Sequence, residues 1–232
     1  MNFSDYFNQT GSLVKYQASG DLVAVAKNFD VTILETNSLR VMQKYEFIDI
    51  VSHLEWSPDG VYLLIGISKR AQAFVRSMED PDWNCKIDEG LAGMVNCLWA
   101  PTSRHVITVS EFNVRLTVWS MIDKSVQYIQ CPKHDGNNEN QKGLAFSPNR
   151  KVMALIEKST DESRDLIGLY DLSAALATNV RGPQNWKCLH QFYPDTFDAQ
   201  DLLFTQDGNH LMVWESPLKN SLQVYQIVYG PS

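Results

Sequence analysis

Apolar and polar residues alternate over short distances in this chain, which indicates β-strands. At His53-Leu54-Glu55-Trp56 the apolar positions are two residues apart, so Leu54 and Trp56 lie on one face of the predicted strand. A second apolar run, Val61-Tyr62-Leu63-Leu64-Ile65, follows directly after a short polar connection. Two such runs predict a β-hairpin. No window approaches the roughly 18 uninterrupted apolar residues of a membrane-spanning helix.

The connection between these two runs, Ser57-Pro58-Asp59-Gly60, is typical of a tight turn. The Ser side chain can form a hydrogen bond with the local backbone, and Pro presets φ at the second position. Gly relieves steric strain at the fourth position. The same pattern recurs at residues 97–103, 144–150 and 202–208, and more faintly at 14–20. Each copy contains an aromatic anchor on the strand before the turn; the anchors are Tyr16, Trp56, Trp99, Phe146 and Phe204.

The anchors are spaced by 40, 43, 47 and 58 residues, against a WD-repeat period of about 40–45. The widest gap contains polar segments around residues 160–163 and 181–184, which we interpret as loops. About twenty residues after an anchor, a third strand is predicted at Val118-Trp119-Ser120, Leu169-Tyr170-Asp171 and Val224-Tyr225-Gln226, with degenerate copies at 75–77 and 33–35. Short fourth strands are predicted at 83–87 and 126–129. None of the copies carries an unmodified Trp-Asp pair.

Four-stranded antiparallel sheets that are apolar on both faces need neighbouring sheets to cover them, and radial stacking provides that cover. The predicted fold class is therefore all-β, a WD-repeat β-propeller of four-stranded antiparallel blades with about five blades visible. The alternative is a β-sandwich, which predicts no common turn at a fixed offset from an aromatic. The five units are residues 11–47, 48–90, 91–135, 136–193 and 194–232.

Five blades are at the low end for a closed ring. We expect a single propeller domain over residues 1–232 that is truncated at its C-terminus, because residues 229–232 follow directly after a predicted third strand. The alternative is that five blades close alone and that residues 1–10 add a strand to the last one.

The net charge of the chain and its lack of complete catalytic motifs limit the classes of function that we expect. A formal net charge of −7 and a pI near 5.2 disfavour nucleic-acid binding, which needs clustered Lys and Arg. The first residues lack a secretory leader, so we expect a cytoplasmic protein. The four cysteines and five histidines show no metal-ligand spacing, and no phosphate loop or nucleophile elbow is complete. We therefore expect no enzymatic activity, no cofactor and no metal; a propeller hydrolase with side chains converging at the ring axis is the catalytic alternative.

Several segments resemble the centrosomal WD-repeat protein eight family. They are the opening Met1-Asn2-Phe3-Ser4, residues 83–93 between the second and third repeats, residues 111–120, and residues 124–129 with Pro132-Lys133. The similarity covers Met1 to about Tyr170, while residues 172–182 look like an insertion.

The resemblance implies a protein-interaction scaffold of the cytoskeleton, at the centrosome, spindle pole or basal body. Such a scaffold helps to anchor microtubule minus ends. Its implied partners are a coiled-coil centriolar-satellite or spindle-pole protein and a minus-end-directed kinesin, with no membrane. An RNA-associated or translation-linked WD-repeat module is the alternative, although the acidic balance disfavours it.

The candidate protein-binding residues fall into two groups. The first comprises Lys69, Arg70, Arg76, Trp83, Lys86, Asp88 and Glu89. Arg76 occupies the position where Trp119 and Tyr170 are expected to pack, so it is either a guanidinium for an acidic partner or an arginine whose stem packs while its head reaches solvent. Trp83 is either an interface anchor or an inter-blade packing residue.

The second group comprises Glu111, Phe112 and Arg115, which are predicted to project from one rim of the ring. The alternative is a turn filled by an internally packed Phe112.

Overall fold

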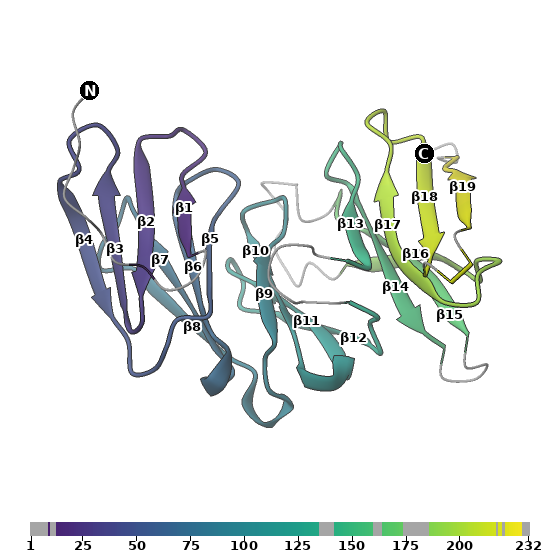
Figure 1. Cartoon of the computed structure of the whole chain (residues 1–232), viewed down its shortest axis with the longest axis horizontal. Coiled ribbons are helices and arrows are strands. Elements are labelled where there is room, and N and C mark those ends of the chain that lie inside the picture. Colours follow the sequence, from purple (N-terminus) through teal and green to yellow (C-terminus); the bar gives the residue numbers. More distant parts are fainter. Residues whose placement is uncertain are drawn as a thin grey trace. The chain divides into compact units, whose positions relative to one another are not determined.

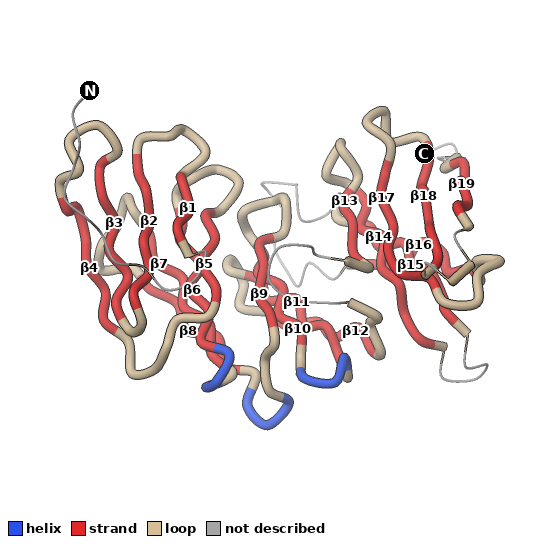
Figure 2. Tube along the Cα trace, in the orientation of Figure 1, coloured by secondary structure: helices blue, strands red, loops and turns tan. Residues whose placement is uncertain are grey.

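The computed structural model describes residues 9, 13–134, 142–159, 164–173, 186–216, 218–219 and 221–228. The chain divides into two compact units, residues 1–108 and 109–232, which are treated in turn. Almost all regular structure is β, as Figure 2 shows in red, and the short 3-10 turns η1 (Ser68–Arg70), η2 (Gly90–Ala92) and η3 (Glu111–Asn113) are drawn in blue. The predicted all-β fold class is therefore confirmed.

Antiparallel strands of the first unit follow one another in sequence order (Figure 1). The first sheet is β1-β2-β3-β4 and the second is β5-β6-β7-β8. Their bounds are β1 Val14–Tyr16, β2 Leu22–Lys27, β3 Asp30–Glu35, β4 Val41–Glu46, β5 His53–Trp56, β6 Tyr62–Ile67, β7 Gln72–Ser77 and β8 Asn84–Asp88. The third repeat begins with β9 (Asn96–Trp99) and β10 (His105–Val109).

The second unit starts with β11 (Arg115–Ser120) and β12 (Val126–Gln130), and the third sheet has the order β12-β11-β10-β9. The fourth sheet is β13-β14-β15-β16, and the fifth, among the described residues, is β17-β18-β19. Their bounds are β13 Leu144–Phe146, β14 Val152–Lys158, β15 Asp165–Asp171, β16 Lys187–Phe192, β17 Ala199–Phe204, β18 His210–Glu215 and β19 Leu222–Gln226.

Each of the five predicted repeat units contains one of these sheets. The predicted loops at 160–163 and 181–184, and a strand from residues 1–10, lie outside the described residues apart from residue 9. Closure of a single ring and truncation at the C-terminus stay predictions.

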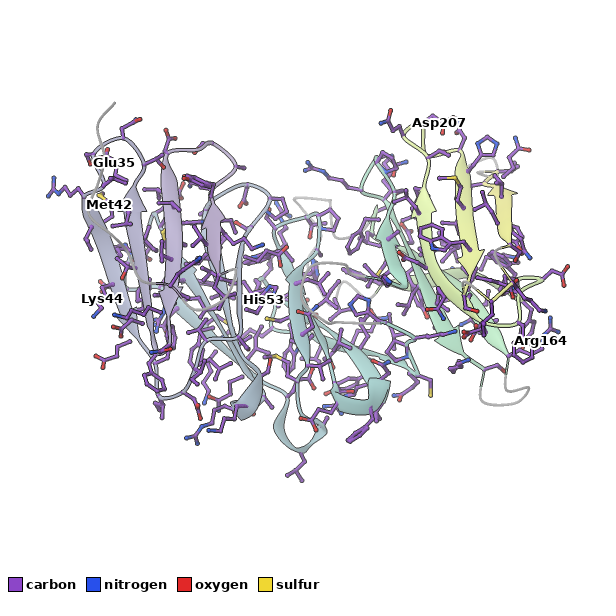
Figure 3. All side chains as sticks on the ribbon, viewed as in Figure 1. Glu35, Met42, Lys44, His53, Arg164 and Asp207 are labelled. Atoms are coloured by element: carbon purple, nitrogen blue, oxygen red, sulfur yellow. The ribbon has the colours of Figure 1, made fainter. Side chains whose placement is uncertain are left out.

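The predicted turn has the expected hydrogen bonds. The N–H of Gly60 donates to the Ser57 carbonyl at 2.8 Å, and the Ser57 hydroxyl donates to Asp59 at 2.6 Å. Gly60 has φ of +76°, a conformation that side chains with a Cβ rarely adopt. Figure 3 labels Asp207 at the corresponding turn between β17 and β18, where the Thr205 hydroxyl donates to its carboxylate. The turn chemistry of the sequence is thus repeated in space.

The aromatic anchors of the first unit are tied to the preceding sheet. The indole N–H of Trp56 donates to the Lys15 carbonyl of β1 at 2.8 Å. The indole N–H of Trp99 donates to the Glu55 carbonyl of β5 at 3.3 Å. Because both bonds run from the first strand of one sheet to the first strand of the sheet before it, the anchors fix successive sheets in the same relation.

Apolar residues of adjacent sheets form one core cluster in each unit. In the first unit Ala24, Val31, Ile33, Leu54 and Ile65 are fully buried between the first and second sheets. In the second unit the fourth and fifth sheets bury a similar set, which includes Ala154, Ile156, Ile167, Ala199 and Val213. Burial of this kind contributes about 25 cal/mol for each Å² of apolar surface removed from water.

The second unit also contains a buried cluster of ion pairs around Asp165. The carboxylate of Asp165 is 1% exposed and lies 2.9 Å from Lys133 and 2.6 Å from Lys158. It also accepts the backbone N–H of Ala199 at 2.7 Å. The cluster therefore joins the fourth sheet to the start of β17.

Candidate functional site

The structure brings three of the predicted site residues to one cavity in the first unit. Arg70, Arg76 and Lys86 line a cavity of about 280 Å³. Its apolar lining includes Phe47, Ile67 and Phe74, with Phe47 and Phe74 ring centroids 5.1 Å apart. We call this cavity the Arg76 groove.

Side chains alternate between the two faces of a strand, and this alternation brings Phe74 and Arg76 to the groove. Phe74 and Arg76 are two residues apart on β7, so they share a face, while Ala73 and Val75 are fully buried on the other face. Lys86 on β8 lies opposite Phe74 in the strand register. The groove thus lies between the outer strands of the second sheet and the end of β4.

Arg76 is the least satisfied cation of the groove. Its Cζ atom lies 5.1 Å from the centroid of the Tyr45 ring, a cation–π contact. Its Nε is buried and has no hydrogen-bond partner within the described residues. Burial raises the pKa of Tyr45, and the Arg76 charge partly opposes this rise. A buried N–H without an acceptor costs free energy in the folded state.

Carboxylates of the same chain already pair with the other cations. The Asp49 side chain, 8% exposed, accepts from Arg70 Nε at 3.0 Å and lies 3.5 Å from Lys69 Nζ. The backbone N–H of Ile50, together with Arg70 and Lys69, lowers the pKa of Asp49.

The fourth cation, Lys86, lies 3.6 Å from Asp88, which also accepts from Gln72 at 2.9 Å. Arg76 is thus the one groove cation for which the described residues show no ion pair.

Sequence reasoning missed Tyr45, Phe47 and Asp49. Nothing in the pattern of the second repeat indicates that these residues of the first repeat lie beside Arg76. The aromatic alternation at Tyr45 and Phe47 was the available signal, because it marks one face of the strand.

Two other candidates of the first group pack within the first unit. The ring of Trp83 is 5.2 Å from Tyr62, which is itself 6.1 Å from Trp99. Trp83 thus packs on its own sheet, and Tyr62 makes the contact with Trp99 of the next sheet, so both interpretations of Trp83 stay predictions. Glu89 is 3% exposed and accepts from the Thr108 hydroxyl, so its side chain belongs to the interior rather than to a docking surface.

The second group of candidates lies in the second unit. Phe112 is 94% exposed with φ of +57°, so it does not fill the turn as the alternative required. Glu111, beside it in η3, is also exposed. Arg115 places its Cζ 4.7 Å from the ring centroid of Tyr128 on the neighbouring strand β12. All three therefore stay candidates for a separate surface.

A second cavity, of about 550 Å³, lies in the second unit between the fourth and fifth sheets. Its lining includes Leu169, Phe192, Tyr225 and Ile227, and the rings of Phe192 and Tyr225 are 4.8 Å apart. His190 stacks on Phe192 at 6.0 Å. We call this cavity the Tyr225 groove; it was not foreseen from the sequence.

In the described part of the chain, no group of three or more His, Cys, Asp or Glu side chains could hold a metal ion. Cys85, Cys97, Cys131 and Cys188 are free thiols, and burial followed by the nearby Glu55 raises the pKa of Cys97. Among the described residues, no helix has the length and apolarity to cross a membrane.

Comparisons with known proteins agree with the repeat architecture. The chain is 33% identical over 227 residues to the WD repeat-containing protein WRAP73 of Mus musculus. This match covers 98% of the chain and 45% of the relative, so the chain spans about half the length of that protein. No family model matches the sequence.

Solved structures with a similar fold include two distant proteins. The β-propeller domain of Myceliophteria thermophila Cps50 (Swd1) aligns with a TM-score of 0.57 at 12% identity, over 90% of this chain and 64% of that chain. Kuenenia stuttgartiensis hydrazine synthase aligns with a TM-score of 0.55 at 9% identity, over 97% of this chain and 70% of that chain. At these identities the likeness shows the fold alone.

Proposed function

Because the chain is a WD-repeat protein built from β-propeller sheets, we propose that it acts as a non-catalytic protein-interaction scaffold at the centrosome, spindle pole or basal body. In this role it helps to anchor microtubule minus ends together with a coiled-coil partner and a minus-end-directed kinesin. A rigid stack of sheets suits such a role, since it presents surface side chains at fixed positions.

The observation that carries the proposal is the Arg76 groove. It joins an aromatic lining to a guanidinium that has no ion pair in the described chain, which is the composition of a protein-binding anchor rather than of a catalytic centre. The cytoskeletal location rests on the resemblance of residues 83–93 and 111–120 to the centrosomal family.

Live imaging and proximity labelling of the tagged full-length protein test the proposal. We expect fluorescence to concentrate at spindle poles in mitosis, or at basal bodies in ciliated cells, and a coiled-coil protein of those structures to be labelled. A core variant, Leu64→Asp, serves as the misfolded control because Leu64 is fully buried. A folded protein that stays diffuse and labels no pole or basal-body component would contradict the proposed location.

A further inference from the structure

We propose that the Arg76 groove binds an acidic segment of a partner protein, with a carboxylate side chain on Arg76 and a neighbouring apolar side chain between Phe47 and Phe74. The inference rests on the proposed scaffold function and names the chemistry of the partner at this site. Four observations support it: the state of Arg76, the size of the cavity, the charges around it and the surface beside it.

The state of Arg76 favours a carboxylate ligand. Its Cζ atom lies over the Tyr45 ring, and a guanidinium in a cation–π contact keeps N–H groups that can donate to an acceptor. Its Nε is buried without a hydrogen-bond partner in the described residues, so the free protein leaves one strong donor unsatisfied. A carboxylate accepts two parallel N–H bonds from a guanidinium, which a neutral amide does not reproduce with equal strength.

The size of the cavity suits an apolar side chain. Its volume is about 280 Å³. One Leu, Ile or Phe side chain would contact the Phe47 and Phe74 rings and Ile67. Burying such a side chain is worth about 1.5–3 kcal/mol, so the apolar contact adds to the charge pair.

The local charge selects an acidic partner. Four cations, Lys69, Arg70, Arg76 and Lys86, stand against three carboxylates, Glu46, Asp49 and Asp88. Asp49 pairs with Lys69 and Arg70, and Asp88 pairs with Lys86, while the described residues show no ion pair for Arg76 or Glu46. The whole chain carries a net charge of −7, so an acidic segment is repelled elsewhere and attracted here. Such charge complementarity fixes the register of the bound segment and raises the rate at which it meets the groove.

The surface beside the groove extends the apolar contact. Ile48, which also lines the cavity, is 86% exposed, and Ile50 is 47% exposed. Between them lies Asp49, held by Arg70. A segment that places its acidic residue on Arg76 can therefore continue over Ile48, where the Asp49 carboxylate is already paired and Glu46 is the one lining carboxylate for which the described residues show no ion pair.

Selection from a displayed random-peptide library tests the inference. The full-length protein is immobilised as wild type, as Arg76→Met, which keeps the length of the stem, and as Lys44→Met. Lys44 is the matched control because it lies on the same strand as Tyr45 but pairs with Asp30 at 2.9 Å, outside the groove. We expect wild type and Lys44→Met to enrich peptides with Asp or Glu close to Leu, Ile or Phe.

An enriched peptide is then synthesised and its Kd measured by fluorescence anisotropy. We expect at least about a tenfold rise in Kd for Arg76→Met, or for a peptide with its Glu replaced by Gln, and a weaker complex at high salt. Lys86→Glu provides a second variant at an exposed side chain, so a folding defect in Arg76→Met cannot mask the result. We expect it to weaken binding as well.

Three results would overturn the inference: enrichment of peptides without acidic residues, equal affinity of wild type and Arg76→Met, or Arg76-dependent binding of an oligouridine RNA in place of peptide.

The proposed scaffold function can fail independently of the groove assignment. If peptide binding behaves as expected but the tagged protein is absent from poles and basal bodies, the location is wrong and the groove assignment stands. If localisation holds and selection fails, the groove assignment is wrong.

Discussion

Arg76 in the first unit and Tyr225 in the second occupy the same register position of their sheets. Arg76 pairs with Leu63, which pairs with the anchor Trp56; Tyr225 pairs with Leu211, which pairs with the anchor Phe204. Each packs on an aromatic residue from the outer strand of the preceding sheet. The two positions therefore differ in chemistry rather than in geometry.

This difference separates stability from recognition. Tyr225 forms an aromatic pair with Phe192 at 4.8 Å and joins the core of the second unit. Within the described residues, Arg76 makes a cation–π contact with Tyr45, and its buried Nε has no hydrogen-bond partner. Residues that cost stability in this way are typical of binding sites, where natural proteins depart from local packing rules. We therefore propose that this repeat position is structural in the fifth sheet and serves binding in the second.

Removing the aromatic ring in the second unit should have the largest effect. We expect Tyr225→Ala to lower the free energy of unfolding of that unit by about 2–3 kcal/mol, because the ring is partly buried against Phe192 and the core. Urea unfolding, with hydrogen exchange of the β18 and β19 amides, measures the change. Val224→Ala is the control; this side chain is 56% exposed on the other face of β19, and we expect a change within about 0.5 kcal/mol. If Tyr225→Ala and Val224→Ala lowered the free energy of unfolding equally, the structural role assigned to Tyr225 would be wrong.

Arg76→Met should act in the opposite direction. It removes a buried donor that has no acceptor in the described chain, and the Met side chain still packs on Tyr45. We expect the free energy of unfolding to rise by about 1 kcal/mol, the desolvation cost less the lost cation–π contact. Arg40→Met, at an exposed position, should leave stability unchanged. A clear loss of stability in Arg76→Met would show that Arg76 is structural.

The smallest effect concerns the titration of Tyr45. Burial raises its pKa and the Arg76 charge lowers it, so Arg76→Met should raise the Tyr45 pKa further. The folded protein then holds this proton more tightly than the unfolded chain. Stability is full below the unfolded pKa and is lost as the pH rises through the folded pKa, and the variant should show the larger loss. Phenolate absorbance, with Tyr45→Phe subtracted, follows the titration; an unchanged or lower pKa would mean that Arg76 does not act on this ring.

The repeat architecture was predictable because it depends on local chemistry. Ser57-Pro58-Asp59-Gly60 specifies its turn through its own side chains, and alternation at Leu54 and Trp56 specifies a strand face. The unusual residue at the Arg76 position was also visible, since it stands where Trp119 and Tyr170 stand in other repeats. These features need no knowledge of the neighbouring sheet.

The groove itself was only partly predictable, because its other half comes from a different sheet. Lys69, Arg70 and Lys86 were named from their charge, but Tyr45, Phe47 and Asp49 were not. Which faces of two sheets meet depends on long-range packing that a single repeat does not encode. Glu89 shows the same limit, since its partner Thr108 lies in the next repeat and makes a charged residue part of the interior.

The indole bonds of Trp56 and Trp99 also have a consequence for biosynthesis. Each donates to a carbonyl that precedes it in the chain, on Lys15 and on Glu55. The acceptor carbonyl is therefore synthesised before the indole donor. When the second or third sheet is made, the strand on which its anchor docks is already present. The second and third sheets can then dock in the order of translation, each on the sheet made before it.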